Sequence, residues 1–525
     1  MKCLFPAGAR SSGLLFLLSL SACDLAPAYQ PPDLELPTHW QGKGPFKEAQ
    51  PADTAVRPGW WKLYHDPLLN RIEEEATASN ADLQAAAERF VQARDMIMGA
   101  QSQLFPQVGI GFGASNNKRS VHRLFNSPAD PIHDSDETFA GLVSWEPDIW
   151  SAIRNKTRAE LNFAEQRAAE YASAQLSLQS QIAWDYFALR GLDAQDAIYK
   201  QSIAYYQQSL NIIKERLSGL VSPKLDVARA ENLLYSTQAE ELDIQAQRQV
   251  MEHAIAILAN TAPSAFHIPP ANTLHTSIPK IPTRVPSDLL QRRPDIASAE
   301  RKMAQANRII GIARAAFYPN VSIRVDGGFT DSGLNLFKVA NSLWAYGADV
   351  TLPIFDGGLR RADLQQSLSA YRETTDNYRS TVLNAFREVE DGLSRTNRLS
   401  AEVKKQHAAV TAASETQTMT MDLYKGGLNT SLDVITAQVN TLTARIREVQ
   451  IQMQLLQVST ELIRALGGGW DKSNLPEQRE MQAFGIFQVD NLDKPPPAGG
   501  IDVQTDPQAN SDLTRPISQQ SKAGH

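Results

Sequence analysis

The chain has 525 residues, 42% of them hydrophobic and 21% charged, so it is long enough to bury a large core or to form two ordinary domains. Its formal net charge is −7, and this acidic balance argues against a nucleic-acid-binding protein, which would carry a basic face. A Walker loop, a GxGxxG turn after a strand and a GxSxG turn are all absent. The nine histidines are scattered, without the spacing of a metal site. We therefore expect neither an enzyme nor a bound metal or cofactor.

The first 22 residues have the pattern of a secretory signal peptide, with a positive start, an apolar run and small residues before a cysteine. The letters LSAC, which end at Cys23, fit a bacterial lipoprotein processing site. We predict that residues 1–22 are removed and that Cys23 becomes the acylated start of a lipid-anchored segment over 23–78. An ordinary signal peptide before a chance cysteine is the alternative. Beyond Cys23 no stretch approaches the roughly 18 consecutive apolar residues of a membrane-spanning helix.

The first half of the mature chain, residues 79–260, begins with apolar residues at helical spacing, and Pro106 ends this expected helix. Two segments in which apolar and polar or small residues alternate follow at about 107–116 and 138–146. We expect the polar loop between them to be exposed. The helical period then returns without a proline from about Ile149 to Leu217, which corresponds to a helix of roughly 100 Å. A tight turn and a returning helix complete this half.

The second half, residues 287–469, repeats the same order of elements. We expect a helix ended by Pro319, strands at about 320–330 and 343–352, a long helix to about Tyr424, a turn and a returning helix. Equivalent positions are about 210 residues apart, far more than in solenoid repeats, so this is a duplicated half-domain.

Two remaining segments differ in composition from the repeats. Residues 261–286 hold six prolines and are expected to connect the halves. Residues 470–525 form a tail rich in Pro, Gln, Gly and Asp, which we expect to be largely disordered, from about residue 490 onward.

The four alternating segments resemble strands of a membrane β-barrel, although a soluble sheet would show the same alternation. Four strands cannot close a barrel, because about eight are the fewest observed, and an open sheet leaves unpaired edges. Chains must then combine, two of them giving eight strands and three giving twelve. A barrel joined to packed long helices would be a conduit. The expected fold is mainly α, with a small membrane β-barrel and duplicated halves, each of strands plus a long helical hairpin.

Three segments resemble the outer membrane factors, the TolC-like channels, and among them the lipidated OprM/NodT-type branch. They are DLAPAYQPP at 24–32, VPSDLLQRRPDI at 285–296 and PIFDGG at 353–358. The resemblance extends from the signal peptide to about Trp470. It implies a homotrimer in the outer membrane, with a twelve-strand barrel joined to a periplasmic α-helical tunnel. It also implies a periplasmic adaptor protein and an inner-membrane transporter, proton-driven, that supplies the energy.

The resemblance further assigns roles to the two turns between the long and returning helices. It makes them the closed periplasmic end and the adaptor-docking tips, whereas glycines there are also ordinary helix caps. The docking residues are Gly219, Leu220, Val221, Ser222, Gly426, Gly427, Leu428, Asn429 and Thr430.

The same resemblance suggests a gate. Asp433 matches a position whose carboxylates ring the pore constriction, where three charges would favour cations. Tyr424 and Asp226 match a pair that links neighbouring helices in the shut state. This chain departs from the family pattern at Thr436, where a second carboxylate ring is expected, and at Asn429, where an arginine is expected. Both aspartates also suit the first turn of a helix, whatever their role in a gate.

A further departure is Asp24, because in enteric bacteria an acidic residue directly after the lipidated cysteine favours retention in the inner membrane. We still expect the protein to be in the outer membrane, because the β-barrel itself directs a chain there. The favoured function is the exit duct of an efflux system for drugs or other small molecules. The alternatives are the channel of a type I protein-secretion system and a non-spanning structural coiled-coil lipoprotein of the periplasm.

Overall fold

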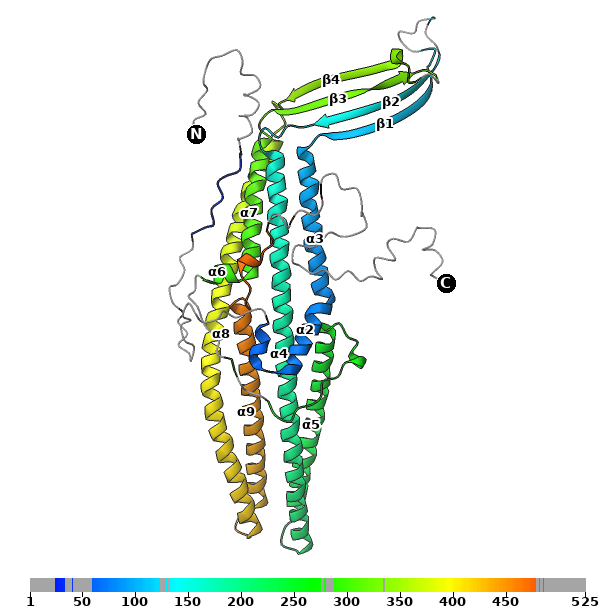
Figure 1. Ribbon diagram of the computed structural model, residues 1–525. Helices are drawn as coiled ribbons and strands as arrows, with labels where there is room; N and C mark the ends of the chain where they lie inside the picture. Colours follow the sequence, from blue (N-terminus) through cyan, green and yellow to red (C-terminus); the bar gives the residue numbers. More distant parts are fainter. Residues whose placement is uncertain are drawn as a thin grey trace.

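The computed structural model describes residues 24–33, 40, 59–122, 129, 132–274, 278–279, 288–333, 336–477, 481 and 485. Helices run lengthwise through the molecule and a four-stranded sheet projects from one end of them (Figure 1). The predictions for the signal peptide, for Cys23 and for disorder beyond residue 490 lie outside the described residues.

The first repeat contains three helices and two strands, and a short helix precedes it. The short helix α2 precedes the upper helix α3, and the strands β1 and β2 lead to the long helix α4 and the returning helix α5. Their bounds are α2 Pro67–Ser79, α3 Ala81–Gln101, β1 Gln107–Lys118, β2 His133–Trp145, α4 Ala152–Ser218 and α5 Lys224–Leu258. Short 3₁₀ turns lie at Trp60–Tyr64, Ser102–Leu104 and Pro263–Ala265.

The second repeat has the same order, and its long and returning helices match those of the first in length, at 67 and 35 residues. Its elements are α6 Leu289–Arg292, α7 Pro294–Ala315, β3 Asn320–Asp331, β4 Ser342–Thr351, α8 Leu359–Lys425 and α9 Ser431–Ala465. Short 3₁₀ turns lie at Val339–Asn341 and Lys472–Asn474.

The expected upper helix of the second repeat, from near Ser287, is interrupted. It divides into α6 and α7 at Arg293, whose backbone is extended with φ −103° and ψ 121°. Proline disfavours the helical conformation in the residue before it, so Pro294 starts α7 and breaks its connection with α6.

The sheet joins the two repeats. Its strands are antiparallel in the order β1-β2-β3-β4, and the central pair β2–β3, with Phe139 opposite Phe329, belongs half to each repeat. Within the described part of one chain, β1 and β4 have no outer neighbour. Both edge strands carry exposed apolar side chains, namely Val108, Ile110 and Phe112 on β1 and Trp344, Tyr346 and Val350 on β4. The sheet therefore has two free edges and a large apolar surface.

Each upper helix is joined end to end with the returning helix of its own repeat. The Asn80 side chain caps α3 and its Nδ2 donates to the Leu258 carbonyl at the end of α5, at 2.9 Å. Arg293 precedes α7, and its Nη1 donates to the Ala465 carbonyl at the end of α9, at 3.0 Å. The long helix of each repeat thus lies beside two shorter helices in series (Figure 1).

Buried apolar clusters hold the repeats together at mid-height and near the tips. The largest cluster combines Trp60 and Tyr64 with Tyr186 and Phe187 of α4 and with residues of α8 and α9. Within it, the Tyr64 hydroxyl and the Ser459 hydroxyl lie 2.6 Å apart. A second cluster near the tips includes Tyr206 of α4, whose hydroxyl donates to the Gln438 carbonyl of α9 at 3.0 Å.

The connector after α5 is fixed by a buried ionic network. Arg248 Nε donates to Asp193 Oδ1 at 2.6 Å, and the same arginine pairs with Glu252 at 2.7 Å. These carboxylates then accept backbone amides of the connector, with Ile268 N at 2.5 Å from Glu252 and Ala271 N at 3.1 Å from Asp193.

No helix in the described part of the chain is both long and apolar enough to cross a membrane.

Arg293 should contribute strongly to stability. Its guanidinium also binds Asp295 at 2.6 Å and Glu388 at 2.8 Å. Arg293→Ala therefore leaves both carboxylates and the last carbonyl of α9 without this donor. We expect a loss of about 2–3 kcal/mol, typical of hydrogen bonds to charged groups, seen as a lower thermal midpoint. The adjacent Arg292→Ala is the control, and equal losses for the two variants would contradict this role.

Glu73 should make stability depend on pH. The side chain is fully buried, none of the described residues donates a hydrogen bond to it, and burial raises its pKa well above the usual value. The unfolded chain loses the Glu73 proton above the ordinary pKa of 4.5, whereas the folded chain keeps it to a higher pH. The wild type therefore loses stability as the pH rises from 4.5 towards the raised pKa of the folded chain.

Glu73→Gln should therefore unfold at a higher temperature than the wild type at pH 8, with a gap that narrows towards pH 4.5. The difference in unfolding free energy between the two proteins changes by at most about 1.4 kcal/mol per pH unit. Thermal unfolding at several pH values measures it, and Glu74→Gln, next to it but exposed and paired with Lys62 at 2.8 Å, is the control. A gap that does not change with pH would contradict a buried neutral carboxyl.

Candidate functional site at the helical tips

The tip of the first repeat is the turn between α4 and α5. Gly219 ends α4, and Leu220 adopts a left-handed backbone with φ 57°, which costs a residue with a Cβ roughly 1 kcal/mol. The turn closes through the Val221 amide, which donates to the Arg216 carbonyl at 2.9 Å. The Leu220 side chain is 93% exposed, whereas Ser222 is buried.

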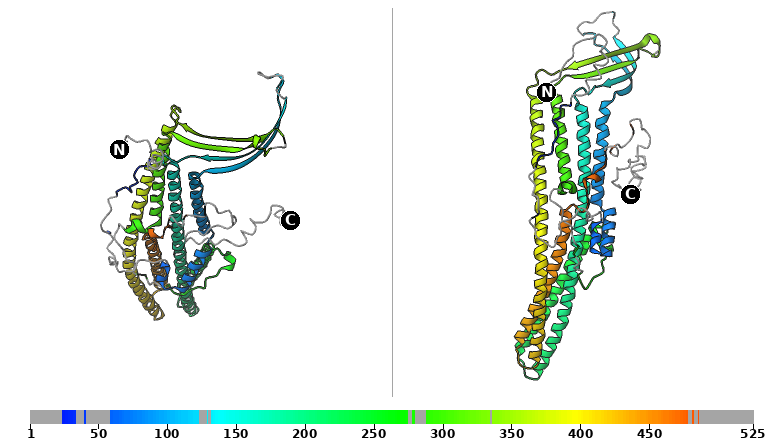
Figure 2. Two further views of the ribbon diagram at one scale, coloured as in Figure 1. Left: turned by 45° about the horizontal axis from the view of Figure 1, so that its top comes forward. Right: turned by 60° about the vertical axis from the view of Figure 1, so that its left-hand side comes forward.

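The tip of the second repeat has the same backbone path with different residues. Gly426 ends α8, and Gly427, with φ 80°, takes the place of Leu220. The Leu428 amide donates to the Leu423 carbonyl at 2.9 Å, and the Leu428 side chain is 79% exposed. Figure 2 (right) shows the two tips close together at the end opposite the sheet.

Asp433 is held by the start of its own helix. It forms a capping box with Thr430. The Asp433 Oδ2 accepts hydrogen bonds from the Thr430 amide at 3.1 Å and from the Thr430 hydroxyl at 2.5 Å. The Asp433 amide donates to the Thr430 hydroxyl oxygen at 3.3 Å. The side-chain hydrogen bond from Thr430, followed by the backbone one, lowers the pKa of the Asp433 carboxyl below its usual value. The carboxylate is exposed and charged at neutral pH.

Asp226, the equivalent position in the first repeat, lacks this box. Pro223 caps α5, and a proline has neither an N–H nor a hydroxyl to offer the carboxylate. The half-buried Asp226 side chain accepts no hydrogen bond from the described residues of the same chain. The two aspartates therefore have unequal freedom.

Tyr424 contacts the first repeat through a residue that the sequence did not single out. The Arg216 guanidinium lies over the Tyr424 ring, 4.6 Å from its centroid, and its Nη1 donates to the Tyr424 carbonyl at 2.6 Å. The Tyr424 hydroxyl lies 3.4 Å from the Ser222 hydroxyl. Among the described residues of one chain, no hydrogen bond joins Tyr424 to Asp226. Arg216 thus places an arginine at the tips, although Asn429 stands where the family pattern has one.

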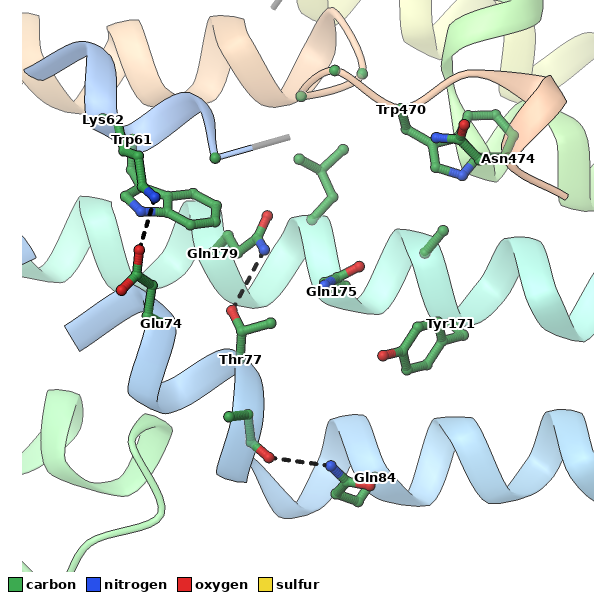
Figure 3. A pocket seen from close by; sticks show the side chains of 17 residues that line it. Trp61, Lys62, Glu74, Thr77, Gln84, Tyr171, Gln175, Gln179, Trp470 and Asn474 are labelled. Atoms are coloured by element: carbon green, nitrogen blue, oxygen red, sulfur yellow. Dashed lines mark hydrogen bonds and ion pairs between the residues drawn. The ribbon is translucent and has the colours of Figure 1, made fainter. Parts of the chain in front are cut away.

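A cavity of about 670 Å³ lies far from the tips, at mid-height, between α2, α4 and the segment after α9 (Figure 3). Its polar side chains bind one another: Lys62 pairs with Glu74 at 2.8 Å, and Gln179 donates to Thr77 at 3.5 Å. Within the described ranges no cluster of His, Cys, Asp or Glu could hold a metal ion.

Known proteins resemble this chain over most of its length. The family model for outer membrane efflux proteins matches residues 73–261 and 285–468. The chain is 27% identical over 455 residues to the probable efflux pump outer membrane protein TtgC of Pseudomonas putida, a match covering 86% of this chain and 93% of TtgC. It is 28% identical over 466 residues to the outer membrane protein OprJ of Pseudomonas aeruginosa, covering 88% and 96%.

A solved structure shares the fold. The crystal structure of the Campylobacter jejuni CmeC outer membrane channel matches with a TM-score of 0.78 and 23% identity, over 86% of this chain and 96% of CmeC. This likeness confirms the expected fold class, mainly helical with a small sheet and duplicated halves. The resemblance inferred from the sequence is confirmed as well, because the family model covers more than half of the chain. The protein belongs to the outer membrane efflux protein family.

Proposed function

We propose that this chain is the exit duct of a tripartite efflux system, through which drugs or other small molecules pass passively from the periplasm to the outside. The observation that carries the proposal is the placement of the sheet. It lies at one end of two 67-residue helices, has two free edges, and exposes apolar side chains on both edge strands. Such a sheet is stable in a membrane only when other chains complete it.

The completed assembly is a homotrimer in this proposal. Three chains supply twelve strands, which close one barrel in outer-membrane lipid, and their helices line one tunnel in the periplasm. A helix of 67 residues spans about 100 Å, several times the roughly 30 Å of a bilayer's hydrocarbon core. The tips therefore lie deep in the periplasm. An acyl chain on Cys23 anchors the other end.

The tips are the docking surface for a periplasmic adaptor protein. The exposed leucines Leu220 and Leu428 give each hairpin an apolar end that a partner helix can cover. An inner-membrane transporter, proton-driven, supplies the energy, and the channel chain itself only conducts.

The gate is formed by the tips of the trimer. Three copies of Asp433 ring the constriction, with Asp226 beside them, while the Tyr424 and Arg216 contact links the two hairpins of each chain. Thr436 stands where the family pattern has a second ring of carboxylates, so the selection of ions by charge depends on Asp433.

The channel itself can be tested directly. Purified protein in mild detergent should run as a trimer on a gel before heating and as a monomer after heating. The trimer should give stepwise ionic currents in a planar lipid bilayer. A protein that shows neither a trimer nor a conductance would contradict the proposed function.

Asp433→Asn should reduce the preference of the channel for cations over anions. The change removes three negative charges from the ring and keeps the side-chain size. Reversal potentials in a KCl gradient measure it. Thr436→Asp is the matched opposite, because it adds a carboxylate about one turn further along α9 and should raise cation preference. Unchanged reversal potentials in both variants would exclude Asp433 from the constriction.

Arg216→Ala should increase the fraction of time for which the channel is open. The variant loses the contact with the Tyr424 ring and carbonyl, so the two hairpins of a chain separate more easily. Single-channel recording at fixed voltage measures the open fraction. The exposed Arg229→Ala on α5 is the control for a lost positive charge. If Arg229→Ala opens the channel equally, the contact with Tyr424 does not hold it shut.

A further inference from the structure

Residues 24–33, which we call the N-terminal strap, lie along the upper helices beneath the sheet. They form the dark-blue segment beside α7 in Figure 1, seen from other sides in Figure 2. The strap has no helix or strand of its own. Side chains of α7 hold its backbone: Arg314 Nη1 donates to the Leu25 carbonyl at 3.1 Å and Asn307 Nδ2 to the Pro27 carbonyl at 2.9 Å.

The strongest contacts are at its first residue. Asp24 Oδ2 accepts Arg158 Nη1 of α4 at 2.7 Å and Arg308 Nη1 of α7 at 3.4 Å. Its Oδ1 accepts Asn155 Nδ2 at 2.8 Å and the Ala26 amide at 3.0 Å. Both carboxylate oxygens are therefore occupied, and their partners come from helices of different repeats.

Electrostatics favour the charged form of this residue. Partial burial alone would raise the pKa of the Asp24 carboxyl, but the hydrogen bonds from Asn155 and Ala26 and the charges of Arg158 and Arg308 outweigh it. The pKa is lowered overall, so the carboxylate is charged at neutral pH. A single exposed ion pair contributes little, whereas a carboxylate shared by two arginines, a side-chain amide and a backbone amide is fixed in one place.

A glycine on α7 makes room for the strap. A Cβ at position 311 would lie 2.8 Å from the Ala26 Cβ and 2.8 Å from Asn155 Nδ2. Any larger residue at Gly311 must push the strap or Asn155 away. Glycine in a helix interior is otherwise unfavourable by roughly 0.5–1 kcal/mol relative to alanine, so a close approach accounts for it here. This contact is independent of the charges around Asp24.

We propose that Asp24 is a positioning residue for the lipid anchor, which fastens the start of the mature chain to both repeats directly beneath the sheet. One peptide bond joins Asp24 to position 23, so an acyl group on Cys23 is confined to the base of the channel. The same contacts occupy both oxygens of this carboxylate after folding, so a factor that reads an acidic residue beside the lipid must compete with them. The lipid part of this inference rests on the proposed acylation of Cys23, whereas the docking of the strap does not.

Limited proteolysis of the purified full-length trimer tests the docking. Chymotrypsin cleaves after aromatic residues, and Tyr29 in the strap donates its hydroxyl to the Glu300 carbonyl at 3.3 Å. Asp24→Ala should raise the rate of cleavage after Tyr29 by about tenfold, because cleavage follows the released fraction. Asp33→Ala, which removes an exposed carboxylate of the same strap, should leave the rate unchanged. Equal rates in wild type and Asp24→Ala would overturn the proposal.

Two further variants separate docking from a loss of charge. Gly311→Ala changes no charge, yet it should raise the cleavage rate, whereas Gly99→Ala, at an open position on α3, should not. Arg158→Ala should also raise the cleavage rate, and the double variant should be no faster than Asp24→Ala alone. Additive effects in the double variant would show that the pair does not act together, against the proposal.

Membrane fractionation tests the second consequence. Wild type and Asp24→Ser should both fractionate with the outer membrane, with mass spectrometry of the N-terminal peptide reporting acylation separately. If the wild type were in the inner membrane and Asp24→Ser in the outer one, Asp24 would be a retention signal and the proposal would fail. Proteolysis does not require an open channel, so failure of the conductance experiment would leave this test intact.

Discussion

The end-to-end joint between the returning and upper helices is the constraint on which the architecture depends. A returning helix of 35 residues covers only part of a 67-residue partner, so the rest of the long helix needs a second helix beside it. The last carbonyls of a helix lack partners within it. Asn80 and Arg293 provide both the second helix and the missing partner. Each stands at the start of an upper helix, and its side chain donates a hydrogen bond to a carbonyl at the end of the returning helix below. Without this joint, neither long helix would be covered continuously from the sheet to the tips.

The duplication preserves backbone geometry more closely than side chains. Asn260 and Gly467 follow the two returning helices, and both have left-handed backbones, with φ 51° and 93°. The tips show the same relation, with Leu220 and Gly427 at equivalent left-handed positions. The side chains differ where the backbone does not: Thr430 fixes Asp433, whereas Pro223 leaves Asp226 without a partner among the described residues of its own chain. The two hairpins are therefore similar in shape and unequal in what they can bind.

Periodicity predicted the regular elements well and their polar ends less well. The first long helix was expected from Ile149 to Leu217 and the second to end near Tyr424, and both lie within a few residues of those bounds. The first strand pair extends into the segment interpreted as a loop, where Asn117 pairs with Asp134. Apolar alternation stops earlier than the hydrogen bonding, because the strand ends carry polar residues on both faces. Sequence pattern therefore marks the apolar part of a strand and not its full length.

Contacts between distant residues could not be predicted from the pattern. Arg216 and Tyr424 are 208 positions apart, and Asp24 and Arg308 are 284 apart, so no local period relates them. Sequence reasoning identified Tyr424 and Asp24 through resemblance, but it assigned them different partners or none. Each arginine stands in an ordinary helical stretch. Only the packing of one repeat on the other shows that it faces a carboxylate or a ring.

The repeats are joined at three levels, and the joints differ in kind. At the sheet, β2 and β3 share a ladder of backbone hydrogen bonds, and the strap crosses between α4 and α7. At mid-height a large apolar cluster, with the Tyr64 and Ser459 hydroxyls inside it, fills the interface. Near the tips the joint depends on a smaller cluster and a few polar contacts such as Arg216 with Tyr424. Local opening is cheapest where buried apolar contacts are fewest. Separation of the hairpins should therefore begin at the tips and stop at the mid-height cluster, which leaves the sheet and the strap unmoved.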